Sequence, residues 1–217
     1  MQSFEIAINY KPIPKIQIEA VGFYSIIQNV IDVGVIYQDP NAFNMVPVGS
    51  DIPGDWNGYW YFKNTPGDFS QIGTEISATY TSPRLSANIS HALVAVASAT
   101  AEQKGIAEAG GSMYLAEDGG SLHFKAYPEN VTRLNMIAKP IKPLSLGFTS
   151  LIYSKWFSPS GSAADGGAIV NLSAEYQFNK TFSLSLVVKN ILSEDALYPM
   201  NSNAGGPDVS PGTPAWE

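Results

Sequence analysis

Few side chains in this sequence have the type and spacing that chemistry requires. Histidine occurs twice, at His91 and His123, and cysteine is absent. Neither histidine has regularly spaced carboxylates nearby, so a metal site is not expected. Ser112 and Ser121 lie near His123 in the sequence, but they lack the strand–turn–helix setting of a hydrolase nucleophile. We therefore predict no catalytic residue, no metal and no cofactor, and hence no enzyme.

A glycine-rich stretch between residues 97 and 130 is a second segment to consider. A phosphate-binding loop requires a following helix and a Lys-Ser/Thr pair, which this stretch lacks. We interpret it as a flexible external loop. The net charge of −7 argues against a nucleic-acid partner, because binding phosphates requires a basic surface.

Aromatic side chains are densest between residues 38 and 68. Six occur there: Phe43, Trp56, Tyr59, Trp60, Tyr61 and Phe62. Such rings bind sugars and similar small molecules through apolar contact and lose little conformational entropy. We predict that four of them contact a ligand: Trp56, Tyr59, Trp60 and Tyr61. The alternative is that residues 59–62 continue a strand and pack on neighbouring loops.

The elements that would position these residues are long strands with alternating polarity. We expect eight strands in four pairs: residues 3–11 with 15–26, 69–80 with 84–96, 131–139 with 144–153, and 168–178 with 182–189. Each pair is joined by a short turn, whereas the stretches between pairs are long. Short turns at one end and long loops at the other are typical of a transmembrane β-barrel, whose two ends face different compartments.

Each strand has one apolar and one polar face. In the last strand, Leu184 and Leu186 alternate with Ser183 and Ser185. In a barrel the apolar face contacts lipid and the polar face lines the lumen. The lumen-facing residues that could line a ligand path, or pair with one another, are Glu5, Glu19, Glu75, Arg133 and Glu175.

Composition also favours a membrane protein. Only 14% of residues are charged, against about 25% in soluble domains, while 45% are hydrophobic. No run of about 18 apolar residues occurs, so a membrane helix is not expected, and a closed barrel is the other way to span a bilayer. Strands of roughly 9–12 residues are long enough to cross at a tilt. Strands in a soluble sandwich, the alternative with the same alternation, usually have about 5–6 residues.

Aromatic residues at the strand ends predict two membrane-interface girdles. One lies beside the short turns and contains Tyr10, Tyr80, Tyr176, Phe178 and Phe182. The second lies at the opposite strand ends and contains Tyr24, Tyr153, Trp156 and Phe157.

One strand departs from the alternation. His91 shares the apolar face of residues 84–96, while Val94 and Val96 fall on the polar face. A β-bulge near His91 would restore the pattern.

Several segments together resemble the TonB-dependent outer-membrane receptors. The similarity lies in a Glu-bearing strand (residues 3–8) followed by a strand ending in an aromatic pair (16–31), a Gly-x-Glu strand (73–78), and the penultimate strands and following loop (171–178 and 182–195). The similarity covers most of residues 3–200, and it rests on the order and spacing of these segments.

The resemblance implies a location in the cell outer membrane. It implies a parent barrel of about 22 strands, plugged by an N-terminal domain, that takes up scarce ligands such as iron–siderophores, cobalamin or glycans with energy from TonB. Residues 1–217 would be a partial barrel domain without the plug and the final strand. The expected partners are outer-membrane lipid, the plug, the remaining strands, TonB through the parent, and a small ligand. The alternatives are an energy-independent porin-like barrel and a soluble all-β sandwich that binds carbohydrate.

Overall fold

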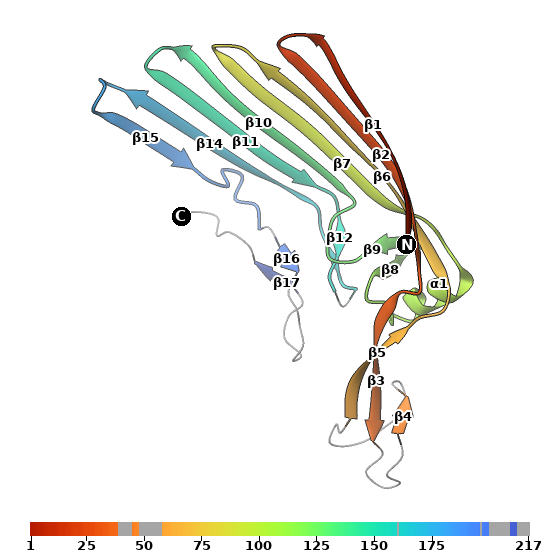
Figure 1. Cartoon of the computed structure of the whole chain (residues 1–217). Coiled ribbons are helices and arrows are strands. Elements are labelled where there is room, and N and C mark those ends of the chain that lie inside the picture. Colours follow the sequence, from red (N-terminus) through yellow and green to blue (C-terminus); the bar gives the residue numbers. More distant parts are fainter. Residues whose placement is uncertain (39–44, 48–57, 160, 196, 200–208, 212–217) are drawn as a thin grey trace.

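The computed structural model describes residues 1–38, 45–47, 58–159, 161–195, 197–199 and 209–211 (Figure 1). Its main feature is one antiparallel sheet of eight strands in the order β1-β2-β6-β7-β10-β11-β14-β15. The strands are β1 (Gln2–Ile13), β2 (Ile16–Gln28), β6 (Asp68–Thr81), β7 (Leu85–Ala99), β10 (Asn130–Ile141), β11 (Leu144–Tyr153), β14 (Gly167–Gln177) and β15 (Ser183–Val188). Successive strands are sheet neighbours, so the predicted all-β, up-and-down arrangement of a β-barrel segment is confirmed.

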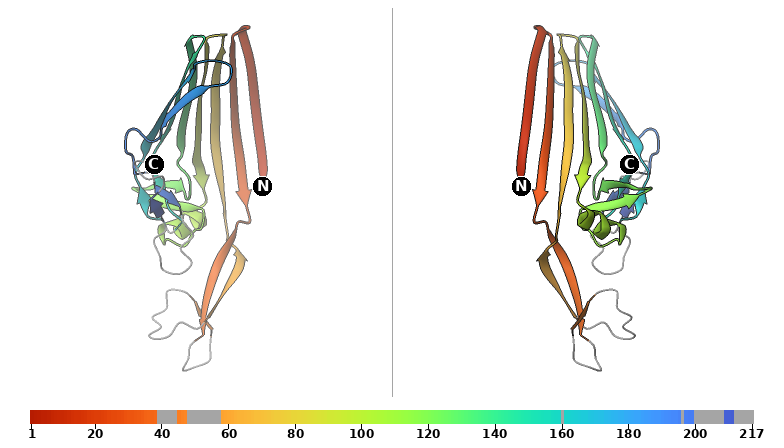
Figure 2. Two further views of the ribbon diagram at one scale, coloured as in Figure 1. Left: turned by 90° about the vertical axis from the view of Figure 1, so that its left-hand side faces the viewer. Right: turned by 90° about the vertical axis from the view of Figure 1, so that its right-hand side faces the viewer.

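The remaining elements are short, lie in the long connections or after β15, and gather at one end of the sheet (Figures 1 and 2). They are β3 (Ile31–Gln38), β4 (Met45–Pro47), β5 (Gly58–Asn64), α1 (Ala101–Glu108), β8 (Leu115–Asp118), β9 (Ser121–Phe124), β12 (Trp156–Phe157), β13 (Ala163–Ala164), β16 (Leu197–Pro199) and β17 (Val209–Pro211). The helix in the described part of the chain is too short and too polar to cross a membrane.

Prolines shape two of the short turns at the other end. Ile13 pairs with Ile16 across a two-residue turn, and the register shifts between Tyr10 and Ile13. Pro12 lies at this shift and has no N–H to donate to the ladder, so the regular pairing is interrupted there. Pro140 lies at the corresponding shift of the β10–β11 pair. The regular ladder of both pairs is therefore interrupted at these prolines, directly before the turns.

Side-chain hydrogen bonds close the other two short turns. The Ser82 hydroxyl accepts the Leu85 N–H at 3.0 Å and donates to the Leu85 carbonyl at 3.1 Å. The Asn179 side-chain oxygen accepts the N–H groups of Thr181, at 2.8 Å, and Phe182, at 3.0 Å. Such Ser and Asn turns satisfy backbone donors that the strand ladder leaves free.

The strand register separates the two faces of the sheet. Directly paired residues share a face, and one row across five strands contains Tyr10, Ile18, Ala78, Ile89 and Leu134. The neighbouring row on the other face contains Asn9, Glu19, Ser77, Ser90 and Arg133. The apolar face is open to the surroundings, and no second sheet covers it within the described residues. The structure is therefore not a sandwich.

The predicted bulge at His91 is wrong. The β6–β7 register is continuous past His91 and shifts only between Ser70 and Gln71, at the loop end. His91 stays on the apolar face, where its Nδ1 lies 2.8 Å from the Thr132 hydroxyl. Val94 and Val96 remain on the polar face because they pack against a hydrophobic cluster in the following loop.

That cluster joins the strands to the loop-end lobe, which we define as residues 101–129. Its buried members come from distant segments: Val30, Phe69, Ala107, Leu115 and Phe124. The interpretation of residues 97–130 as a flexible loop is therefore wrong, because the segment forms a helix and a hairpin with a shared core.

The aromatic residues at the two ends of the strands differ. Beside the short turns, Phe178 contacts Tyr176 and Phe182, with ring centroids 4.8 and 5.2 Å apart, and all three rings are exposed. At the loop end, Trp156 and Phe157 are only 3% and 4% exposed. They pair with β13 in a loop hairpin, so they do not belong to the second predicted girdle.

Candidate functional site

Three of the five predicted lumen-facing residues lie together near the middle of the polar face. Glu19 on β2 and Arg133 on β10 belong to the same row across the sheet, and Glu75 on β6 lies one row nearer the loop end. Together with neighbouring backbone and small side chains, they line a depression of about 170 Å³. Three strands thus contribute two carboxylates and one guanidinium to one surface.

The charged groups of this depression are available to an outside partner. The Glu19 carboxylate accepts hydrogen bonds from Asn9, at 2.9 Å, and Gln17, at 2.6 Å. Arg133 makes no ion pair with Glu19 or Glu75 in the described structure. A guanidinium offers five donors in a fixed plane and carboxylates accept several hydrogen bonds, so the depression can bind polar groups of either charge.

The other two predicted residues lie elsewhere on the polar face. Glu5 pairs with Phe23, close to the loop end of β1. Glu175 lies between Ser145 and Ser185, near the short turns. The structure therefore does not bring Glu5 or Glu175 into the depression formed by the other three.

A row of neutral polar residues on the same face was not predicted as a site. It crosses five strands and contains Thr79, Asn88, Asn135, Thr149 and Asn171. Two of its neighbouring pairs are hydrogen-bonded, Asn88 to Thr79 at 2.9 Å and Asn171 to Thr149 at 3.1 Å. The sequence does contain a signal, because amides and hydroxyls recur in these strands with period two. Only the strand register, however, shows that these residues form one row across the sheet.

The predicted aromatic ligand-binding residues lie partly outside the described structure. Tyr59, Trp60 and Tyr61 lie in the first half of β5, which pairs with β3. Trp56 lies outside the described residues, and so do the side chains of these three. Residues 59–61 therefore do continue a strand, in a small sheet that extends past the end of the main sheet (Figure 1). Their contact with ligand stays a prediction.

Buried polar side chains hold the loop-end lobe together and attach it to the segment before β6. Gln103 is 2% exposed, and its side-chain amide donates to the Thr65 hydroxyl at 2.9 Å and to the Pro66 carbonyl at 2.8 Å. Lys125 is also buried, and its ammonium donates to the Ser112 carbonyl at 2.6 Å. The Gln103 bonds thus attach α1 to the segment between β5 and β6, and the Lys125 bond holds the lobe itself together.

Gly67 is required for the attachment of the helix. It has a φ of +80°, in the region that favours glycine, and a Cβ at this position would overlap the Thr100 hydroxyl. That hydroxyl accepts the Asp68 N–H at 3.2 Å, directly before α1. The glycine therefore lets the start of β6 approach the start of the helix.

Charged pairs link the lobe to the next loop. The Lys155 ammonium lies 2.8 Å from the Asp118 carboxylate and over the Phe157 ring, and the hydrogen bond with Lys155 lowers the pKa of Asp118. His123 stacks on Phe157 and lies 3.1 Å from the Glu129 carboxylate. Within the described residues, no group of three or more His, Asp or Glu side chains is arranged to hold a metal ion.

Comparison with known proteins shows similarity of structure. No family profile and no curated protein sequence matches the chain. Among solved structures, the ferric-catecholate import receptor Fiu from E. coli K12 aligns with 98% of this chain at 16% identity and a TM-score of 0.61. A variant of the ferric enterobactin receptor PfeA from Pseudomonas aeruginosa, in complex with enterobactin, aligns with 99% at 16% identity and a TM-score of 0.57. The copper transporter OprC aligns with 90% at 15% identity and a TM-score of 0.51.

These similar structures are TonB-dependent receptors, so the chain has the fold of a segment of such a receptor barrel. It spans 26%, 28% and 25% of the lengths of the three proteins, about a quarter in each case.

Proposed function

We propose that this chain forms part of the wall of a TonB-dependent receptor that takes up a scarce ligand through the outer membrane. The observation that carries the proposal is a single sheet of long strands whose whole apolar face is uncovered. Ile8, Ile76 and Leu186 are 60%, 51% and 63% exposed, and in water such a surface would be unfavourable. The similarity in fold to import receptors supports the same conclusion.

In this proposal the polar face lines the lumen. Glu19, Glu75 and Arg133 would contact either the plug or a passing ligand, since they make no ion pair with one another in the described structure. Trp56, Tyr59, Trp60 and Tyr61 would contact ligand on the external side. The ligand class stays open among iron–siderophores, cobalamin and glycans, and the copper transporter among the similar structures adds a metal ion to these.

The orientation of the faces can be tested with single cysteine labels. The chain contains no cysteine, so each substitution provides a unique thiol. Nitroxide labels at Ile76→Cys and Ile89→Cys should be accessible to oxygen dissolved in the bilayer, whereas labels at Ser77→Cys and Ser90→Cys should be accessible to a water-soluble nickel complex. Equal accessibility at all four positions would contradict the proposal.

Energy coupling distinguishes a TonB-dependent receptor from a porin-like barrel. The gene, in its native reading frame, would be expressed in cells that lack their own siderophore receptors, and uptake of radiolabelled ferric catecholate, ferrichrome and cobalamin would be measured. Uptake that disappears when tonB is deleted supports a receptor. Uptake that persists without TonB supports the porin-like alternative.

A further inference from the structure

The four short turns carry a strongly unequal distribution of charge. We call residues 11–15, 81–84, 139–143 and 178–182 the basic rim. It contains half of the twelve cationic side chains and none of the nineteen Asp and Glu residues of the chain. The six cations are Lys11, Lys15, Arg84, Lys139, Lys142 and Lys180. Every short turn therefore carries at least one positive charge.

The positive charge of the rim is not balanced locally. All six side chains are exposed, and none makes an ion pair within the described structure. The three ion pairs that do occur lie at the loop end, as do the carboxylates of Asp118 and Glu129. The rim is thus a cationic surface whose six charged side chains make no ion pair within the described structure.

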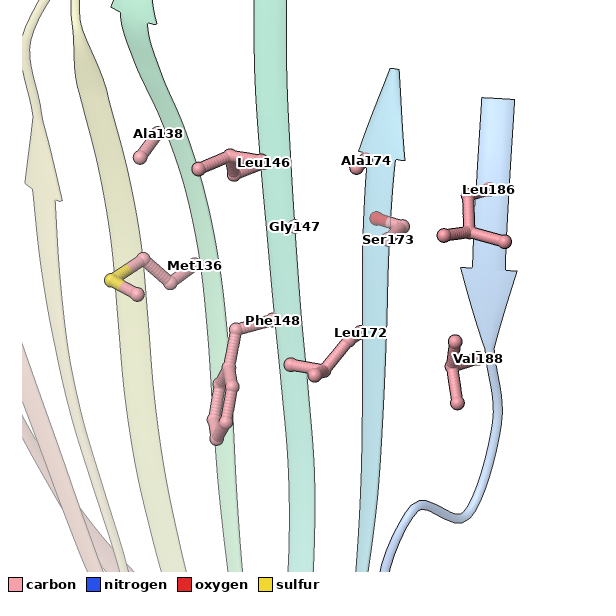
Figure 3. A pocket seen from close by; sticks show the side chains of 10 residues that line it. All are labelled: Met136, Ala138, Leu146, Gly147, Phe148, Leu172, Ser173, Ala174, Leu186 and Val188. Atoms are coloured by element: carbon pink, nitrogen blue, oxygen red, sulfur yellow. The ribbon is translucent and has the colours of Figure 1, made fainter. Parts of the chain in front are cut away.

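A hollow on the apolar face lies next to this rim. It has a volume of about 450 Å³ and lies over β10, β11, β14 and β15, where the row of Ala138, Leu146, Ala174 and Leu186 alternates small and large side chains (Figure 3). We call this hollow the apolar trough. Its wall residue Ala138 directly precedes Lys139 of the basic rim, so the two features are adjacent.

We propose that the basic rim and the apolar trough together bind an anionic phospholipid of the leaflet at the short-turn end. The phosphate would contact Lys139, Lys142 and Lys180, and an acyl chain would lie in the trough. Phe178 and Phe182 of the rim and the neighbouring Tyr176 form a cluster of rings beside the trough, at the level where aromatic rings meet headgroups. The inference rests on the proposed function, because the trough contacts hydrocarbon only if the apolar face is the lipid-facing one.

Charge complementarity favours a lipid over a soluble anion. A cationic side chain close to an anionic membrane surface strengthens association about fivefold. An acyl chain also fills a trough that water cannot wet favourably, since Ser173 is the one lining residue with a hydrogen-bonding side chain and the other lining residues are apolar. A phosphate without acyl chains would gain only the electrostatic part of the binding free energy.

The test uses the full chain in bilayers of phosphatidylglycerol and phosphatidylcholine. Electron paramagnetic resonance of spin-labelled lipids gives the ratio of the association constants of the two lipids. We expect a preference for phosphatidylglycerol that falls about fivefold or more in Lys142→Gln/Lys180→Gln and disappears in about 1 M salt, where charges are screened over about 3 Å. The control Lys63→Gln/Lys104→Gln removes the same charge at the loop end and should keep the preference.

Three outcomes would overturn the inference. One is an equal preference in the rim variant and the unmodified chain. Another is displacement of the spin-labelled lipid by glycerol phosphate as effectively as by phosphatidylglycerol, which would indicate a site for soluble phosphate. The third is unchanged lipid association in Ala174→Leu, which partly fills the trough without changing charge.

Failure of the proposed function gives a different result. A chain that does not insert into either bilayer, as shown by digestion of its strands by added protease, would contradict the membrane role itself. A protease-resistant chain without lipid preference would contradict only the lipid site.

Discussion

The loop-end lobe and the wall of strands use apolar side chains in opposite ways. At the loop end lie all the buried hydrophobic residues of the described structure: Val30, Phe69, Ala107, Leu115, Ala116, Phe124, Trp156, Phe157 and Ala164. Along the wall, Ile6, Ile8 and Leu186 are each at least 60% exposed. The lobe is built as a small protein core that excludes water, whereas the wall depends on apolar surroundings that the chain itself does not supply.

The largest effect is expected from breaking the core of the lobe. Phe124 is 4% exposed and its ring packs edge-on against Phe69, with centroids 6.1 Å apart. Phe124→Ala should destabilise the docked lobe by about 3–5 kcal/mol, because it removes a buried ring and leaves a cavity. Hydrogen exchange of residues 101–129 in detergent measures this. Phe182→Ala, on the exposed wall, should leave the exchange of the lobe unchanged, and a similar change in both would contradict the comparison.

The second prediction breaks the wall instead. Ile76 lies near the middle of β6 on the apolar face, so Ile76→Arg should cost about 2–4 kcal/mol of folding free energy in a bilayer. The matched variant Ser77→Arg places the same charge on the polar face, where the cost should be small. Urea-dependent unfolding from lipid vesicles compares the two. Equal costs would mean that the faces are assigned incorrectly.

A third variant tests how the cost of an arginine on the apolar face depends on its depth in the bilayer. Leu184 lies only two residues beyond Phe182, near a short turn, on the same face as Ile76. Leu184→Arg should cost about 0–1 kcal/mol, because an arginine near the interface reaches water and headgroups. The same vesicle titration measures it. A cost as large as that of Ile76→Arg would show that this end of the sheet lies deeper in the bilayer than its aromatic residues indicate.

The smallest effect concerns pH and is confined to the lobe. The hydrogen bond from Lys155 lowers the pKa of Asp118 in the folded state, so this pair stabilises docking above the unfolded pKa of about 4. The stabilisation is lost as pH falls through the lowered folded pKa. Protease sensitivity of residues 112–126 should therefore rise modestly in acid. Asp118→Asn should abolish this acid-induced rise in protease sensitivity. The protease sensitivity of the wall strands should not change with pH in the same way.

The sequence allowed the wall to be predicted almost completely. Alternation with period two is a local property, and proline or Asn at four turns marked the strand ends within about two residues. The paired strands also placed Glu19 and Arg133 on one face, although their row became visible only through the register of β2, β6, β7 and β10.

The lobe could not be predicted in the same way. Its core joins residues from Val30 to Phe124, and such contacts between distant segments leave no periodic signal. Val94 and Val96 interrupt the polar pattern of their face because they pack against the core of the lobe, which the pattern of their own strand does not reveal. Trp156 and Phe157 have the residue types and the position of a membrane-interface girdle, although a short hairpin buries them.

The outermost strands of the sheet, β1 and β15, are not paired with each other. Along the twelve residues of β1, roughly six amide hydrogens and six carbonyl oxygens point away from β2, because an antiparallel strand alternates its bonding sides. In hydrocarbon each would cost several kcal/mol if left unsatisfied. The sheet must therefore enter the bilayer as its two edge strands, β1 and β15, pair with one another or with further strands. A sheet with unpaired edges would not be stable in the membrane.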